Sequence, residues 1–171
     1  VEALDQLGLR DRTIIIFTTD NGTPPAKQAA VEEACRVPLI INAPGILKIS
    51  GTRDELIDFT DLFPTFVDLS GGQLPKDYIL DGHSFAPLLL GEPYREREWI
   101  FSAVGHHRML RSRRWLYDGG GHFSYCGSSR DPRDYQDVTD SDNPEVVAAR
   151  QEFEEILKQL PAPDEKDPLW E

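Results

Sequence analysis

The sequence has 171 residues, of which 39% are hydrophobic and 28% are charged, the balance of a globular chain rather than a disordered one. Its 30 acidic and 18 basic residues give a net charge of −12, so binding to nucleic acid or to an anionic membrane through bulk charge is disfavoured. No apolar run approaches the roughly 20 residues of a membrane span. We therefore expect a globular protein with one domain, or one domain and a small appendage.

Two apolar, β-branched segments predict strands in the first third of the chain. Residues 13–19 read Thr-Ile-Ile-Ile-Phe-Thr-Thr, and residues 37–42 read Val-Pro-Leu-Ile-Ile-Asn. Such runs, which lack polar alternation, are typical of strands buried on both faces in a parallel sheet flanked by helices. The intervening residues 26–34 are expected to form a helical turn or an ordered loop, which suits an α/β layout.

A longer apolar pattern follows. Apolar residues spaced by three and four over residues 55–69 predict a helix that contains Pro64 and stops at Gly71 and Gly72. The composition changes after residues 91–93, which read Gly-Glu-Pro. The predicted organisation is therefore an α/β part at residues 1–92 and a small α+β subdomain at residues 93–171.

The second part is predicted to hold antiparallel strands and a terminal helix. Residues 99–104 and 108–117 are rich in aromatic and basic side chains and read as two strands. An apolar stripe over residues 144–160 predicts a helix. Asn143 is suited to cap this helix, and Pro144 is suited to its first position.

The sharpest candidate site is Asp20-Asn21-Gly22, at the carboxyl end of the first predicted strand. Ligands gather at that edge of open α/β sheets. A carboxylate beside an amide carbonyl provides the hard oxygen ligands that calcium and magnesium prefer. The alternative is an ordinary turn, because Asn-Gly and Asp-Gly are common turn dipeptides.

Lys27 follows this triplet by seven residues. A lysine just beyond a metal-binding turn can neutralise a tetrahedral oxyanion as a point charge. Taken alone, Lys27 is interpreted as a solvated surface lysine.

These pieces, taken together, resemble motifs of the type I sulfatases, including arylsulfatases. Residues 8–22 are similar to a family segment in which an apolar strand runs into Ser-Asp-Asn-Gly. Lys27 stands nine residues before Arg36, which begins Arg-Val-Pro. This is the spacing of the family's Lys…Glu-Gly-Gly-x-Arg-Val-Pro element, and Glu32 falls on its glutamate.

Two further elements resemble the same family in the same order. Residues 58–71 are similar to Asp-Leu-x-Pro-Thr-Leu-Leu-Asp-Leu-Ala-Gly, and residues 81–91 to Asp-Gly-x-Ser-Leu-x-Pro-Leu-Leu-x-Gly. The resemblance covers about residues 4–91. Residues 94–171 match more loosely, as the small C-terminal region of four strands and a helix.

The resemblance implies a fold, a reaction and a set of site residues. The fold is the C-terminal part of a mixed-sheet domain like those of sulfatases and alkaline phosphatases, and the reaction is hydrolysis of a sulfated small molecule or glycan. Asp20 and Asn21 match the second pair of ligands to a divalent cation, calcium or magnesium. Lys27 matches the lysine that contacts the sulfate near the leaving-group oxygen. Glu32 and Arg36 match residues that hold the loop against the sheet.

The family's nucleophile motif, Cys/Ser-x-Pro-x-Arg, does not occur in these 171 residues. The resemblance implies a formylglycine nucleophile upstream, so the chain alone is expected to be inactive. The segment from Cys126 to Arg130 resembles a replacement, but Ser128 stands where Pro or Ala is expected, and we interpret it as a surface loop. Without the missing part, the strand at residues 13–19 would have exposed edges and faces, which predicts self-association.

The loop before Arg-Val-Pro departs from the family, since Glu33 and Ala34 replace its paired glycines and Cys35 replaces a small apolar residue. This loop motivates one alternative, a non-catalytic scaffold or binding domain. A second alternative is a phosphonate or phosphate monoester hydrolase of the same superfamily, because sulfate and phosphate are both tetrahedral oxyanions and the metal chemistry is shared.

Two other groups of residues are given structural roles. His106 and His107 are adjacent on a predicted strand and should point to opposite faces, so they and His122 are expected at a surface or interface rather than at a metal. The basic cluster at residues 108–114 is expected to form internal salt bridges with acidic stretches.

Overall fold

The computed structural model describes residues 1–22, 26, 29–129 and 131–160. They form a first unit, Val1–Thr18 with Pro38–Arg97, and a second unit, Thr19–Val37 with Glu98–Glu171. The mixture of helices and strands confirms the α/β class. Residues 19–37 belong with the C-terminal strands, so neither unit is one continuous stretch of sequence. A domain boundary near residue 92 stays a prediction.

The two predicted strands are confirmed in the first unit as β1 (Ile15–Thr18) and β2 (Leu39–Asn42). The expectation of a parallel sheet buried on both faces is wrong for this pair, because β1 and β2 run antiparallel with Phe17 opposite Ile40. Phe17 and Ile40 remain 59% and 58% exposed. Leu39 and Ile41, on the other face of β2, pack against the core. The described residues thus cover one face of this sheet.

The predicted helix at residues 55–69 begins later than expected. The structure has a single 3₁₀ turn, η3 (Phe59–Asp61), followed by α3 (Leu62–Leu69). Asp58 sets this start, because its side chain accepts hydrogen bonds from the Thr60 backbone N–H at 2.9 Å and from the Thr60 hydroxyl at 2.8 Å. Asp61 completes a capping box, with its Oδ2 accepting from the Asp58 N–H at 2.8 Å.

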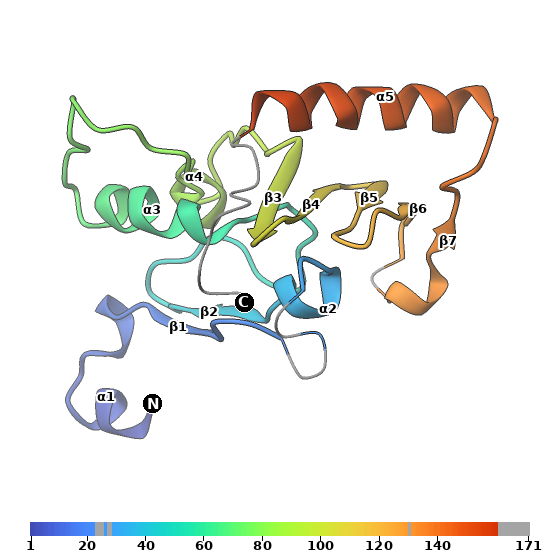
Figure 1. Ribbon diagram of the computed structural model, residues 1–171. Helices are drawn as coiled ribbons and strands as arrows, with labels where there is room; N and C mark the ends of the chain where they lie inside the picture. The colour runs from blue at the N-terminus through green and yellow to red at the C-terminus, as the bar shows by residue number, and fades with distance from the viewer. Residues whose placement is uncertain (23–25, 27–28, 130, 161–171) are drawn as a thin grey trace. The chain divides into compact units, whose positions relative to one another are not determined.

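Other short helices complete the first unit: α1 (Glu2–Gln6), η1 (Arg10–Arg12) and α4 (Ala86–Leu89). Its core is formed by Phe85, Leu88 and Leu89. The side chains packed around them come from β2, α3 and the connecting loops: Leu39, Ile41, Leu47, Ile49, Ile57, Leu62, Leu69 and Tyr94. Figure 1 shows α3 and α4 side by side in this unit.

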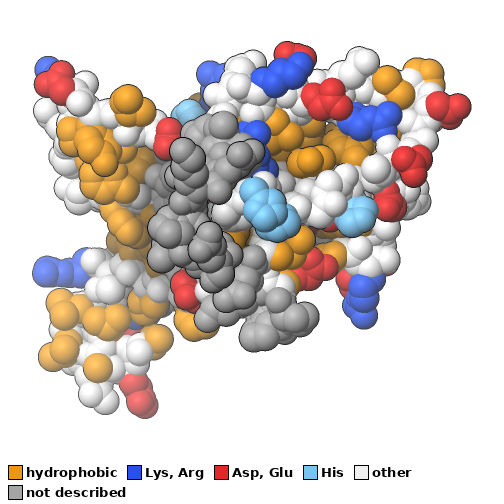
Figure 2. Space-filling view, viewed as in Figure 1, with side chains coloured by type: hydrophobic (Ala, Val, Ile, Leu, Met, Phe, Trp, Pro, Cys, Tyr) orange, Lys and Arg blue, Asp and Glu red, His pale blue; other side chains and the backbone are white. Residues whose placement is uncertain are grey.

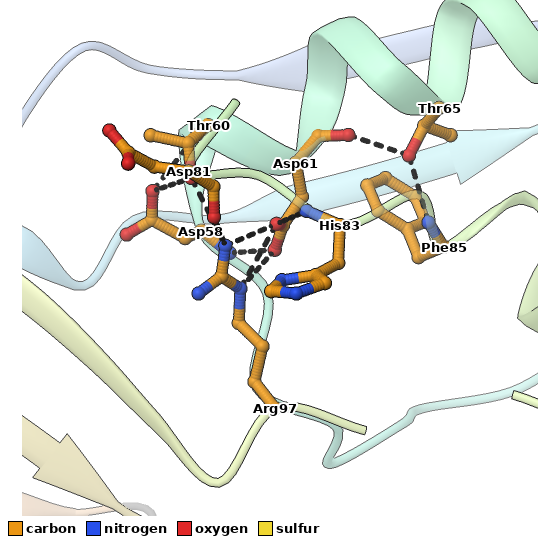
Figure 3. Close-up of polar contacts among 8 residues, drawn as sticks. All are labelled: Asp58, Thr60, Asp61, Thr65, Asp81, His83, Phe85 and Arg97. Atoms are coloured by element: carbon orange, nitrogen blue, oxygen red, sulfur yellow. Dashed lines mark hydrogen bonds and ion pairs between the residues drawn. The ribbon is translucent and has the colours of Figure 1, made fainter. Parts of the chain in front are cut away.

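A buried carboxylate joins distant segments of the first unit (Figure 3). Asp61 is fully buried and accepts from Arg97 Nη2 at 2.6 Å and from the His83 N–H at 2.6 Å. Thr65, one turn later, donates its hydroxyl to Asp61 O at 2.6 Å and accepts the Phe85 N–H at 2.9 Å. These bonds fasten residues 81–85 to the start of α3.

The second unit is built on a five-stranded antiparallel sheet in sequential order. Its strands are β3 (Trp99–Val104), β4 (His107–Ser112), β5 (Trp115–Tyr117), β6 (Phe123–Tyr125) and β7 (Gln136–Asp137). The predicted strand at 108–117 is wrong in extent, because residues 113–114 form a bend that separates β4 from β5. The described region has five strands where the resemblance implied four.

Helices cover both faces of this sheet, as Figure 1 shows. The predicted C-terminal helix is confirmed as α5 (Pro144–Gln159), with Asn143 Oδ1 accepting the Glu145 N–H at 2.9 Å. One face packs α5 through a cluster of Leu110, Phe123, Val146, Ala149 and Phe153. The other face carries α2 (Glu32–Cys35) and a cluster of Ala30, Met109, Leu116 and Cys126. A short 3₁₀ turn, η4 (Pro132–Asp134), precedes β7.

The first unit exposes a row of aromatic side chains, which predicts self-association of the isolated chain. Phe59, Phe63 and Phe66, spaced by four and three, are 46%, 48% and 47% exposed, and Figure 2 shows hydrophobic side chains gathered over α3. We expect light scattering after size exclusion to find dimers or larger species, because such surface is unfavourable in water. Phe63→Ser combined with Phe66→Ser should shift the chain toward monomer, whereas Leu7→Ser should not. A monomeric wild type would contradict this expectation.

Candidate functional site

The predicted cation ligands lie in a compact turn directly after β1. The Thr19 hydroxyl donates to Asn21 O at 2.7 Å and accepts the Asn21 N–H at 3.3 Å. The Asn21 amide nitrogen donates to Gly22 O at 2.8 Å, which leaves its Oδ1 as the atom to offer a cation. The neighbouring Asp20 is exposed to solvent. A carboxylate and an amide oxygen thus stand in adjacent positions of an ordered turn.

Gly22 fixes this turn against α2. Its N–H donates to Ala34 O at 2.7 Å. A Cβ at Gly22 would lie 1.8 Å from Glu33 O, so every residue with a side chain is excluded there. The glycine of the triplet is therefore required by the close approach of two backbones, which an ordinary Asn-Gly turn does not demand.

The donor set suits part of a calcium or magnesium shell. Both ions take hard oxygen ligands, and calcium takes six to eight of them. Asp20 and Asn21 supply two such groups. Among the described residues, no group of three or more His, Cys, Asp or Glu side chains could hold a metal ion. These two residues fit a cation as partial ligands, and the remaining oxygens would have to come from other parts of the protein or from substrate and water.

The third predicted site residue, Lys27, lies outside the described residues, as do residues 23–25 and 28. Its role as a sulfate-binding and catalytic residue stays a prediction.

The expectation that Glu32 holds this segment against the sheet is confirmed, with partners that the sequence had not identified, whereas the same expectation for Arg36 stays a prediction because its bond is to Glu32 itself. Glu32 is 5% exposed, and its Oε2 accepts from Arg111 Nε at 3.2 Å. Its Oε1 accepts from the Tyr135 hydroxyl at 2.9 Å and from Arg36 Nη1 at 3.3 Å. The basic cluster at residues 108–114 thus supplies an internal salt bridge, as predicted.

Burial and neighbouring charged groups both shift the pKa values of residues in this network. Burial alone lowers the pKa of Arg111, but the neighbouring Cys126, Glu32 and Tyr135 raise it above its ordinary value. Burial raises the pKa of Tyr135, so its hydroxyl stays protonated and donates a hydrogen bond to Glu32. The result is an ionised Arg111 and a protonated Tyr135 around one buried carboxylate.

The histidines are arranged differently from the prediction. His106 lies in the turn between β3 and β4, and its ring centroid is 4.0 Å from that of His107. The two rings do not point to opposite faces, because the turn residue is released from strand alternation. A ring nitrogen of His107 lies 2.6 Å from Gly119 O, and one of His122 lies 3.3 Å from Asp118.

Cys126 is not on the surface. It is 3% exposed in the cluster beneath α2, and its Sγ lies 3.9 Å from Ser124 O. The interpretation of its segment as a surface loop is therefore wrong at this residue, because the chain turns inward after β6. Arg130, the last residue of that segment, lies outside the described residues.

Comparison with known proteins gives a consistent result. The sequence pattern described as "N-sulphoglucosamine sulphohydrolase, C-terminal" matches residues 26–161. An ulvan-active sulfatase of Formosa agariphila is 32% identical over 104 residues, which cover 61% of this chain and 20% of that protein. Arylsulfatase D of Homo sapiens is 32% identical over 127 residues, covering 63% and 21%. The chain spans about a fifth of the length of these relatives.

Solved structures show the same fold. A 2-O GAG sulfatase superposes with a TM-score of 0.71 at 24% identity, covering 92% of this chain and 38% of that one. A phosphonate monoester hydrolase of Agrobacterium radiobacter superposes with a TM-score of 0.68 at 23% identity, covering 92% and 36%. At these identities the superpositions establish the fold. No helix in the described part of the chain has both the length and the apolar character that crossing a membrane requires.

Proposed function

This chain belongs to the sulfatase family, as the C-terminal portion of such a protein, and from that premise we propose that it forms part of an enzyme that hydrolyses sulfate esters. The observation that carries the proposal is the ordered turn after β1. There Asp20 and Asn21 present adjacent oxygen ligands, and the Gly22–Ala34 hydrogen bond of 2.7 Å holds the turn in place.

In the proposed site, Asp20 and Asn21 hold a divalent cation, calcium or magnesium. Such an ion, when bound, polarises the oxygens of the sulfate group and supports the nucleophile. Asp20 supplies negative charge from a solvent-exposed position, and Asn21 supplies a neutral oxygen whose direction is set by its own amide hydrogen bond. One charged and one neutral ligand suit a site that must also accept an anionic substrate.

Lys27 is proposed to contact the sulfate near the leaving-group oxygen. A lysine there would offset negative charge that develops on that oxygen as the ester bond breaks. The nucleophile, a formylglycine by the resemblance, would come from a part of the protein outside residues 1–171.

The substrate is proposed to be a sulfated small molecule or glycan. The relatives support this class, since one is named for ulvan and a solved neighbour is a 2-O GAG sulfatase. A phosphonate monoester hydrolase shares the fold as well, so a phosphorus ester is the second candidate. Sulfate and phosphonate groups are both tetrahedral oxyanions, and the same cation ligands would serve either one.

Turnover of matched aryl esters tests the proposal. We expect a protein that joins this chain to the remainder of its sulfatase domain to hydrolyse 4-nitrophenyl sulfate with a kcat/KM about 100-fold or more above that for 4-nitrophenyl phosphate or phenylphosphonate. The 171 residues alone should turn over none of these esters. Preference for a phosphorus ester would establish the second candidate, and no turnover of any ester by the joined protein would favour a non-catalytic scaffold.

A further inference from the structure

The cation-ligand turn lies within the second unit and not with the strand that precedes it. Asp20, Asn21 and α2 all fall in the segment Thr19–Val37, which belongs with the C-terminal sheet. Something in that sheet must therefore hold the turn. The contacts that do so can be followed in two steps, from the sheet to α2 and from α2 to the turn.

The first step joins the sheet to α2 through a buried ionic network. Arg111 on β4 reaches Glu32 at 3.2 Å, and both side chains are 6% exposed. The Tyr135 hydroxyl adds a bond of 2.9 Å to the same carboxylate, and the guanidinium carbon of Arg111 lies 5.5 Å from the centre of the Tyr135 ring. Arg111 also donates to the backbone O of Ser112. The Glu32 carboxylate is thus bonded to one side chain from β4 and to one from the residue that precedes β7, and these bonds restrict its rotation.

Backbone and thiol contacts support the same attachment. Gly119 N–H donates to Ala30 O at 2.7 Å, and Ala30 is fully buried. Cys35 Sγ lies 3.3 Å from Ser102 Oγ on β3. These contacts place α2 on the sheet, but only the Glu32 network involves charge.

That charge is informative because a buried ion pair is a poor way to gain stability. The cost of removing two charges from water offsets most of their attraction, and apolar replacements are often as stable. Directional hydrogen bonds to a buried carboxylate, in contrast, allow one position of the helix that carries it. The network is better suited to setting the place of α2 than to adding free energy of folding.

The second step joins α2 to the turn. The Gly22 N–H donates to Ala34 O, and a Cβ at Gly22 would overlap Glu33 O. With this close approach, a shift of α2 must move Gly22 and hence the adjacent Asp20 and Asn21. The turn and the sheet are therefore linked by a continuous series of hydrogen bonds through α2.

We propose that Arg111 and Tyr135 are positioning residues for the cation ligands Asp20 and Asn21, acting through Glu32 and α2. This inference rests on the proposed function for the identity of the ligands, but the mechanical link can be tested without it. The small C-terminal sheet would then contribute to the site, because it determines the positions of the two ligands Asp20 and Asn21.

Hydrogen exchange in the 171-residue chain tests the link. We expect the Gly22 amide to exchange about tenfold faster in Tyr135→Phe and faster still in Arg111→Met, because its acceptor on α2 is no longer held. Arg111→Met leaves the buried Glu32 with the partly exposed Arg36 as its cation, which is expected to destabilise the unit. The double variant Glu32→Gln with Arg111→Met removes both buried charges, and the Arg36 side chain, at 44% exposure, remains accessible to solvent. This variant should recover the melting temperature while Gly22 still exchanges fast.

Arg114→Met is the matched control, because Arg114 lies in the bend between β4 and β5 and pairs with Glu145 on α5 instead of Glu32. Its Gly22 exchange should equal that of the wild type. Unchanged Gly22 exchange in both Tyr135→Phe and the double variant would overturn the proposal, whether or not the complete protein hydrolyses sulfate.

Signal broadening by manganese(II) is a second measurement. A purely structural role of Arg111 and Tyr135 would leave it unchanged. In nuclear magnetic resonance spectra, Mn²⁺ should broaden the Asn21 side-chain amide signal of the wild type, and the double variant should need about tenfold more Mn²⁺. Equal Mn²⁺ requirements in both would overturn the positioning role. Absence of broadening in the wild type would count against the cation in the proposed function, and the exchange experiment would then decide the link alone.

Discussion

Replacing Asp61 with alanine is expected to lower the free energy of unfolding by about 3–5 kcal/mol, because it leaves a buried guanidinium without its counter-charge. Asp61 is fully buried, and the side chain of Arg97 is 11% exposed. Asp61 also accepts two backbone N–H groups, those of Asp58 and His83, which would lose their acceptor. Urea unfolding followed by circular dichroism measures the change.

An exposed ion pair provides the control for this prediction. Arg133 lowers the pKa of Asp131 to about 2, yet both side chains face solvent. Because solvent and salt screen such pairs, Asp131→Ala should cost only the cap that Asp131 provides to η4, well below the loss in Asp61→Ala. If Asp61→Ala behaved in the same way as Asp131→Ala, the buried network would have no role in stability.

A double-mutant cycle separates the ion pair from the rest of the network. Arg97→Met removes the cation and leaves Asp61 with its two backbone donors. The combined loss in Asp61→Ala with Arg97→Met should be smaller than the sum of the single losses, by about 0.5–3 kcal/mol. Additive losses would show that the two side chains act independently.

Removing the proposed cation ligand should have the largest effect on catalysis. In the complete protein, Asp20→Ala is expected to lower kcat/KM for an aryl sulfate about 1,000-fold, equivalent to about 4 kcal/mol of transition-state stabilisation. Asp20→Asn keeps an oxygen ligand, so added calcium should restore part of its activity. Lys27→Ala should lower kcat/KM about 100- to 1,000-fold, and calcium should not restore it.

The activity measurements on the Asp20 and Lys27 variants need a control variant that changes charge alone. Glu152 is an exposed acid on α5, and Glu152→Gln removes one negative charge without touching the turn. Its activity and calcium dependence should equal those of the wild type. Full activity in Asp20→Ala would remove this residue from the site, and restoration of Lys27→Ala by calcium would show that Lys27 acts through the cation.

The candidate site could be predicted only in part from the sequence. Asp20 and Asn21 follow a strand directly, so their place could be read from local pattern. The partners of Glu32 could not, because Arg111 and Tyr135 are 79 and 103 residues away along the chain. Many arginines fall in that basic region, and nothing local distinguishes Arg111 from Arg114, which pairs with Glu145 instead.

The sequence by itself determined the features that depend on near neighbours: the presence of β1, β2 and β3, the capped start of α5, and membership of a family through motifs in a fixed order. Strand propensity and helix caps depend on a few neighbouring residues, so the local sequence determines them. Only the tertiary structure decided that β1 and β2 run antiparallel, that a bend divides residues 108–117, and that residues 19–37 belong with the C-terminal strands. These depend on which distant segments meet, and burial and pairing energies settle that only when the whole chain packs.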